Sequence, residues 1–140
     1  MNGTTDILNP FAQMIADAAD IRNALHAAVT DLEMAIEAEA TARRTAKEAR
    51  ESYEAAEAEF VAETLPACDA KNAEGRKAQL DVALVAARRA GVLAATFARM
   101  NAAAYDSEDA KMALEQASKR FRATESAADL TAAMLRAATR

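Results

Sequence analysis

No glycine or proline occurs between Pro10 and Pro66. These two residue types are the strongest helix breakers, whereas alanine, the best helix former, is the commonest residue of the stretch. Asn9 is a good N-terminal cap, and Pro10 fits the first helical position, where its missing N–H costs nothing. The stretch therefore predicts one helix over residues 10–64, about 80 Å long at about 1.5 Å per residue.

The remainder of the chain predicts two further helices. A loop over residues 65–72 leads to a second helix over 73–104, with Asn72 as its cap and Glu74 in its first turn. The stretch YDSEDAK then offers an aspartate or a serine as a cap, which predicts a third helix over 107–139.

Composition supports the same fold class. Three glycines and two prolines leave too few turn residues for a fold of many hairpins. Aromatic residues make up only 4% of the chain, so its core is thin and suits closely packed helices. We therefore expect an all-α chain that forms a single elongated domain over residues 1–140. A long N-terminal helix and two shorter antiparallel helices would form a coiled-coil-like three-helix arrangement.

A coiled-coil seam is predicted along the first helix, because apolar residues there alternate spacings of four and three. These residues are Leu25, Val29, Leu32 and Ile36. The same register continues to Arg43 and Arg50, and a charge at a seam position can fix the register or the oligomeric state.

The unequal helix lengths predict self-association. The second and third helices would be about 20 residues shorter than the first, and would leave its apolar N-terminal part uncovered. Bare apolar surface of this kind marks an interface. We therefore expect a homo-oligomer joined through the first helix, at Ile15, Ile21, Leu25, Val29, Leu32 and Ile36. The alternative is that the first helix breaks near Asp20 and folds back on itself.

Small and apolar residues recur along the later helices as well. In the second helix, Ala87, Gly91 and Ala94 would let another helix approach closely. The third helix has a regular heptad pattern with spacings of three and four throughout. Its positions are Leu114, Ala117, Phe121, Thr124, Ala128, Thr131, Leu135 and Ala138.

Charge is unevenly distributed along the chain. Residues 1–68 contain 5 Lys and Arg against 13 Asp and Glu, whereas residues 69–140 contain 12 against 9. This asymmetry favours self-association through opposite faces, or a partner that meets only the basic half. The candidate nucleic-acid contacts are Arg76, Lys77, Arg88, Arg89, Lys119, Arg120 and Arg122. The alternative is a solvated basic face, because Phe97 and Phe121 fall on the apolar seam rather than beside these charges.

Catalytic and metal-binding motifs are not evident. The chain has one histidine, His26, and one cysteine, Cys68, so neither a His/Cys metal motif nor an internal disulfide can form within it. A glycine-rich phosphate loop is also missing. We expect no enzymatic activity, no cofactor and no bound metal.

The sequence also bears on location. It has no stretch approaching the roughly 20 apolar residues that a membrane span needs. The beginning of the sequence lacks the basic and apolar regions of a secretory signal. We expect an intracellular, soluble protein that does not contact membranes.

The stretch KNAEGRKAQLDVAL resembles a pattern in small, alanine-rich helical proteins encoded by bacteriophages. The matching positions are Asn72, Arg76, Lys77 and Ala78, and more loosely Phe121, Leu130 and Leu135. The resemblance covers residues 69–137, and Gly75 departs from the helix-favouring residue expected there. Such proteins are of unassigned function and often lie among recombination or replication genes. The resemblance implies an accessory of phage DNA metabolism.

Three functions remain open on these grounds. The first is an oligomeric helical adaptor with a protein partner, which assists phage recombination or replication on single-stranded DNA in the host cytoplasm. The second is a virion component of the neck, tail or capsid. The third is a small inhibitor of a host defence protein, whose acidic helix imitates nucleic acid. That acidic face would consist of Glu48, Glu51, Glu54, Glu57, Glu59 and Glu63.

Overall fold

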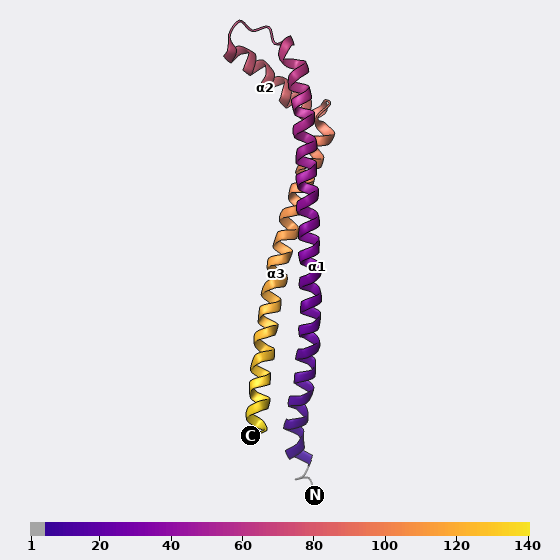
Figure 1. Ribbon diagram of the computed structural model, residues 1–140, viewed down its shortest axis with the longest axis vertical. Coiled ribbons are helices and arrows are strands. Elements are labelled where there is room, and N and C mark those ends of the chain that lie inside the picture. Colours follow the sequence, from indigo (N-terminus) through magenta and orange to yellow (C-terminus); the bar gives the residue numbers. More distant parts are fainter. Residues whose placement is uncertain (1–4) are drawn as a thin grey trace. The chain divides into compact units, whose positions relative to one another are not determined.

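The computed structural model describes the backbone of residues 5–140 and the side chains of residue 10 and residues 12–140. Its elements are α1 (Thr5–Thr64), the one-turn 3-10 helix η1 (Leu65–Ala67), α2 (Ala73–Ala90) and α3 (Ala94–Ala138). Figure 1 shows these helices, and residues 5–140 contain no strand. The all-α class with a long first helix is confirmed.

The first helix is continuous over 60 residues, which excludes the alternative of a break near Asp20. It ends at Thr64 as predicted, where η1 and Pro66 follow. Its start differs from the prediction, because α1 begins at Thr5 and Pro10 lies inside it. A proline this close to a helix end removes one hydrogen bond, and the helix-favouring residues around it continue the helix.

The turn between α1 and α2 confirms the predicted cap. The side-chain oxygen of Asn72 accepts a hydrogen bond of 2.7 Å from the N–H of Gly75, and Glu74 lies in the first turn of α2. A Cβ atom at position 75 would lie 2.7 Å from the Cβ of Ala70 and 2.8 Å from the capping oxygen of Asn72. Glycine therefore fits this tight turn, which is why a helix-favouring residue is missing there.

The second break was predicted at the wrong place. Helix α2 ends at Ala90, and the N–H of Gly91 donates to the carbonyl of Ala87 over 3.1 Å. A Cβ atom on Gly91 would lie only 2.8 Å from the Cα of Ala87. Gly91 therefore ends a helix, instead of allowing a neighbouring helix to approach as predicted.

The stretch YDSEDAK lies inside α3, so the predicted boundary between residues 104 and 107 is wrong. Ser107 is half-buried at a position that continues the spacing of Ala103 and Ala110, while Tyr105 is exposed. A capping residue ends a helix only where leaving the helix lowers the free energy of the chain. Here the apolar period continues through YDSEDAK, so the helix continues as well. As a result α2 has 18 residues and α3 has 45, instead of nearly equal lengths.

The residue contacts divide the chain into two compact units. Unit 1 consists of the first part of α1, up to Ala38, and of Lys111–Arg140, which includes the second part of α3, whereas unit 2 is Glu39–Ala110. The expectation of one domain over residues 1–140 stays a prediction. The expectation that the N-terminal part of α1 would be left uncovered is wrong, because the long α3 packs with it in unit 1.

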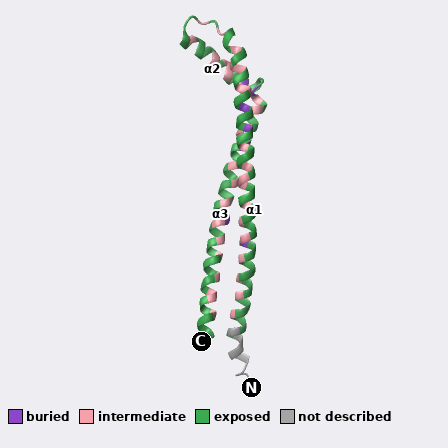
Figure 2. Cartoon of the chain, in the orientation of Figure 1, coloured by how far each residue is buried: buried purple, intermediate pink, exposed green. Residues whose placement is uncertain are grey.

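Burial follows a repeat along α1, where buried and half-buried residues recur on one side of the helix in Figure 2. One series of these positions alternates spacings of four and three: Met14, Ala18, Ile21, Leu25, Ala28, Leu32, Ala35, Glu39, Ala42, Ala46, Ala49, Tyr53, Ala56 and Phe60. Five further positions outside this series are half-buried: Val29, Ala40, Glu57, Val61 and Thr64. The predicted series through Leu25 and Leu32 is therefore correct. The other predicted series is displaced by one residue, since Ala28 takes the place predicted for Val29.

Arg43 and Arg50 consequently lie outside the seam, with side chains 71% and 63% exposed. Alanine occupies the corresponding seam positions at 42 and 49. Two helices approach closely only where their facing side chains are small, so the alanines are selected over their larger neighbours. The heptad predicted for α3 is confirmed from Leu114 to Leu135, because all seven of these positions are buried or half-buried.

Unit 2 contains an apolar cluster. Tyr53 of α1, Ala87 of α2 and Leu93 are buried, and Phe60 and Phe97 pack against them. Leu93, in the turn between α2 and α3, is only 1% exposed. Three helical segments thus enclose a small core in this unit.

Candidate functional site

Two adjoining hollows lie between α1 and α3 in unit 1. One has a volume of about 390 Å³ and is lined by Met14, Asp17, Asp20, Ile21, Thr131 and Met134. The second has a volume of about 360 Å³ and is lined by Ala24, Ala27, Ala28, Asp31, Ala117, Arg120, Ala123 and Thr124. Both open on the same flank of the helix pair, and together we call them the alanine groove.

Helical periodicity explains why the groove forms. Its lining residues on α1 recur at spacings of three and four along one side of the helix, beside the seam. They are Asp17, Asp20, Ala24, Ala27 and Asp31. Because three of the groove residues between positions 24 and 28 are alanine, no large side chain fills the space there.

Large apolar side chains are exposed on the same flank. Met34 continues the spacing of Ala27 and Asp31 on α1, and it is 64% exposed. On α3, Leu130 and Met134 continue the spacing of Arg120 and Ala123, and they are 63% and 53% exposed. The groove is therefore bordered by apolar side chains that water now covers.

The two sides of the alanine groove differ in charge. Its α1 side carries Asp17, Asp20 and Asp31, whereas its α3 side carries Arg120. This is the local form of a wider asymmetry. Residues 14–38 contain five Asp and Glu and one Arg, while residues 111–140 contain six Lys and Arg and three Asp and Glu.

The residues predicted at the oligomer interface are divided by the structure. Ile21, Leu25 and Leu32 belong to the seam that α1 forms with α3 inside one chain. Val29 is half-buried on the flank opposite the groove. Ile15 and Ile36 lie on that flank and are 52% and 51% exposed, so two of the six remain largely open to a partner.

In unit 2 the predicted nucleic-acid contact Arg88 is held by side chains of α1. Its Nε donates to the hydroxyl oxygen of Tyr53 over 2.5 Å, and its terminal nitrogen lies 3.1 Å from a carboxylate oxygen of Glu57. The guanidinium carbon also lies 5.8 Å from the ring centre of Tyr53 and 5.6 Å from that of Phe97. Arg88 is therefore engaged within the chain and poorly placed to contact a phosphate.

This Arg88 cluster changes the protonation of its members. Hydrogen bonding from Tyr53, with help from Arg88, lowers the pKa of Glu57 below its ordinary value of 4.5 against the opposing effect of burial. Burial, and then Glu57, raises the pKa of Tyr53 above 10.0. Hydrogen bonds to Tyr53 and Glu57 raise the pKa of Arg88. The cluster is thus fixed as a cation, an anion and a neutral phenol.

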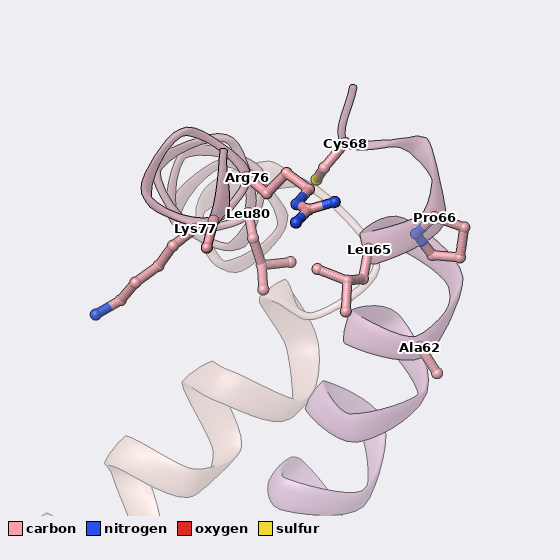
Figure 3. A pocket seen from close by; sticks show the side chains of 8 residues that line it. Ala62, Leu65, Pro66, Cys68, Arg76, Lys77 and Leu80 are labelled. Atoms are coloured by element: carbon pink, nitrogen blue, oxygen red, sulfur yellow. The ribbon is translucent and has the colours of Figure 1, made fainter. Parts of the chain in front are cut away.

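Two other predicted contacts, Arg76 and Lys77, line a cleft of about 620 Å³ where α1 meets α2. Figure 3 shows Leu65 and Leu80 pointing into the space between the helices, while Lys77 points away from it. Cys68 lies in the same cleft, half-buried, and its thiol donates to the carbonyl of Thr64 over 3.6 Å.

The remaining predicted contacts, Arg89, Lys119, Arg120 and Arg122, are exposed. A different set of cations is brought together by the structure. Arg43, Lys47 and Arg50 line a hollow of about 450 Å³ in unit 2, together with Asn101 and Ser107 of α3. We call this the cationic hollow.

Each cation of the cationic hollow has one acidic neighbour on α1. These pairs span 3.8–3.9 Å, and all their side chains are exposed except that of Glu39, which is 18% exposed. Pairs of this kind contribute only about 0.3–0.5 kcal/mol each, so an incoming phosphate can replace them. Sequence reasoning missed this site because it assigned Arg43 and Arg50 to the seam, one residue out of register.

The sequence held a signal for the alanine groove as well. Small residues recur beside the seam on both helices, as Ala24 and Ala27 on α1 and as Ala123 and Ala127 on α3. A pattern search weighted towards large apolar residues passes over such positions.

No group of three or more His, Cys, Asp or Glu within the described residues is placed to hold a metal ion. None of the helices in the described part of the chain is both long enough and apolar enough to span a membrane. Comparison with protein-family models, with curated proteins and with solved structures gave no match to this chain.

Proposed function

We propose that this protein is a non-enzymatic helical adaptor that works as a homo-oligomer. The observation that carries the proposal is the alanine groove, an apolar concave surface bordered by exposed Met34, Leu130 and Met134. Exposed apolar surface of this extent is characteristic of protein interfaces. Adaptor activity requires such a surface, and it requires no catalytic group.

The biological setting follows from the resemblance to bacteriophage proteins. We propose that the adaptor assists recombination or replication on single-stranded DNA. The virion component and the defence inhibitor stay alternatives. For the inhibitor, Glu57 is unsuited to the imitation of nucleic acid, because Arg88 neutralises it within the chain.

Direct contact with DNA is a second candidate function, and the cationic hollow favours it. Three cations on one side of α1 line a concave surface, with the amide of Asn101 and the hydroxyl of Ser107 opposite. Such an arrangement binds phosphates of the nucleic-acid backbone without regard to base sequence, and its affinity falls as salt rises.

Light scattering coupled to size-exclusion chromatography tests the adaptor proposal. We expect the intact chain to run as a multimer with a mass that is a whole multiple of 14.9 kDa. A monomer at every concentration would contradict it. The same experiment with a labelled single-stranded oligonucleotide, at low and at moderate salt, tests DNA contact, because a phosphate contact weakens as salt rises.

Two matched variants locate any DNA contact. The first replaces Arg43, Lys47 and Arg50 by alanine, and the second replaces Arg76, Lys77 and Arg89 by alanine. Both remove three exposed charges from unit 2. We expect the first to weaken oligonucleotide binding about tenfold or more at low salt, and the second to weaken it less. Equal losses would assign the effect to net charge instead of the hollow.

A further inference from the structure

We propose that the alanine groove is occupied by a second copy of this chain, with α1 of one copy lying over α3 of the other. This inference rests on the proposed function, because a second copy can fill the groove only if the chain self-associates. It adds the face that is used, the partner that fills it and the orientation of that partner.

The shape of the groove selects a helix as its occupant. Its floor is formed by Ala24, Ala27 and Ala28 of α1 and by Ala117 and Ala123 of α3. Helix axes approach closest where the facing side chains are small, and two hollows in series along the helix pair can be spanned by one continuous helix. Exposed Leu130 and Met134 are themselves on a helix beside the groove, so another copy of α3 offers matching side chains.

Charge determines which helix of the second copy fits. The α1 side of the groove carries three aspartates, and the α3 side carries Arg120. If α1 met α1 of the second copy, the aspartates would face one another. If α1 meets α3, Arg120 of each copy faces the aspartates of the other. The second arrangement is favoured, because like charges brought together across an interface are costly.

A two-fold axis lets α1 of each copy meet α3 of the other through the same surface patch. In such an isologous dimer each copy gives the same patch, so every pairing of α1 with α3 occurs twice. The product is a four-helix bundle made from two helix pairs, and the open flank of each pair becomes the inside of the bundle.

The opposite flank of the helix pair is the natural comparison. It exposes Ile15 and Ile36, but it also carries Arg22, His26 and Glu33, and the two hollows that form the alanine groove lie on the other flank. Two exposed isoleucines 21 positions apart make a poorer site for a continuous helix than the groove does.

A pair of matched double variants tests the inference. Ala27→Glu with Ala123→Glu places two carboxylates in the groove without altering the seam, because both alanines are exposed. Ala19→Glu with Ala133→Glu makes the same chemical change at exposed positions away from the groove. Analytical ultracentrifugation would give the dissociation constant of each, and circular dichroism its helix content.

We expect the groove variant to raise the dissociation constant by about 100-fold or more, because it buries unpaired charge. The control variant should change it less than about threefold. If the wild-type chain is a multimer and the groove variant matches its control, this inference is overturned while the proposed function stands. If the wild-type chain is a monomer, both are overturned.

Charge exchange tests the orientation separately. Arg120→Glu should weaken association at least tenfold, because it places an acid opposite the aspartates of the second copy. Adding Asp31→Arg in the same chain should recover most of that loss. A second variant that weakens association further would contradict the pairing of α1 with α3.

Cross-linking covers the case in which the glutamate variants fold poorly. Chains carrying Cys68→Ala and Ala27→Cys are mixed with chains carrying Cys68→Ala and Ala123→Cys, and a short bis-maleimide is added. A product that joins one chain of each kind is expected. Products that join only identical chains would overturn the proposed orientation.

Discussion

Among the described side chains of unit 1, the two that are buried are both alanines, Ala28 and Ala117, whereas unit 2 buries Tyr53 and Leu93 as well. Both units use the same alternation of three and four residues. The difference is the number of helical segments, since unit 2 adds α2 and its turn to the pair. Two helices can bury only a seam between them, while three enclose a core. Unit 2 therefore encloses a core within one chain, although Val82 and Val92 stay exposed, whereas unit 1 buries only a seam and is open on its flanks.

The largest loss of stability is expected from a cavity in the core of unit 2. Leu93→Ala removes a side chain that is 1% exposed and leaves a cavity among Tyr53, Phe97 and their neighbours. We expect a loss of about 2–4 kcal/mol in the free energy of unfolding, measured by urea denaturation. Leu130→Ala in unit 1 removes the same atoms from a side chain that is 63% exposed in the isolated chain.

Leu130→Ala serves as the matched control at protein concentrations where the chain is monomeric. There it should cost less than about 0.5 kcal/mol, because little area is withdrawn from water. Equal losses from both variants would mean that unit 1 buries as much as unit 2, which would remove the contrast between them. Hydrogen exchange after Leu93→Ala should rise in residues 39–110 first.

A smaller effect is expected from the Arg88 cluster. Arg88→Ala removes the partner of Tyr53 and Glu57 and should cost about 1–2 kcal/mol, because it leaves a half-buried carboxylate without its cation. Arg89→Ala changes the neighbouring exposed residue and should be nearly neutral. Urea denaturation of both variants measures the difference.

A double-mutant cycle shows whether Arg88 acts through Glu57. In the background of Glu57→Gln, the cost of Arg88→Ala should fall by about half or more. An unchanged cost would assign the stabilisation to the contacts of the guanidinium with the rings of Tyr53 and Phe97.

The comparison also explains which features the sequence predicted. The continuity of α1, its end at Thr64 and the cap at Asn72 followed from local chemistry, because proline and asparagine act on the backbone beside them. The break at Gly91 did not. Glycine there prevents a clash with the backbone of Ala87, a contact that appears only when the turn is formed.

The seam register failed for a related reason. Val29 and Ile36 are more apolar than Ala28 and Ala35, so a search for hydrophobic residues selects them. Close packing selects the alanines, because helix separation depends on the size of the facing side chains. Because of the same register error, Arg43 and Arg50 were assigned to the seam and the cationic hollow was not predicted. Ile36 was assigned to an interface as a seam residue, although it lies beside the seam and is exposed. In alanine-rich helices the small residues, and not the most hydrophobic ones, therefore mark the helix contact.

The smallest expected effect is a pH dependence confined to unit 2. The pKa of Glu57 is lowered in the folded chain, chiefly by Tyr53 and also by Arg88, so the stability from this carboxylate is present above pH 4.5. It is lost as the pH falls through the lowered pKa. At the other extreme the raised pKa of Tyr53 favours its neutral form, so that contribution is present below pH 10.0 and is lost as the pH rises through the raised pKa.

Because the Glu57 side chain is 31% exposed, solvent screens its interaction and the acid-side loss should stay below about 1 kcal/mol. Urea denaturation of the wild-type chain and of Glu57→Gln, between pH 3 and pH 7, measures it. The two curves should converge as the pH falls, because the wild-type carboxylate becomes neutral like the amide. Tyr53→Phe should remove the alkaline loss and part of the acid loss, since the phenol also lowers the pKa of Glu57. Parallel curves would show that the ionisation of Glu57 does not stabilise unit 2. The difference in stability between the two units would then come from packing and not from this charge.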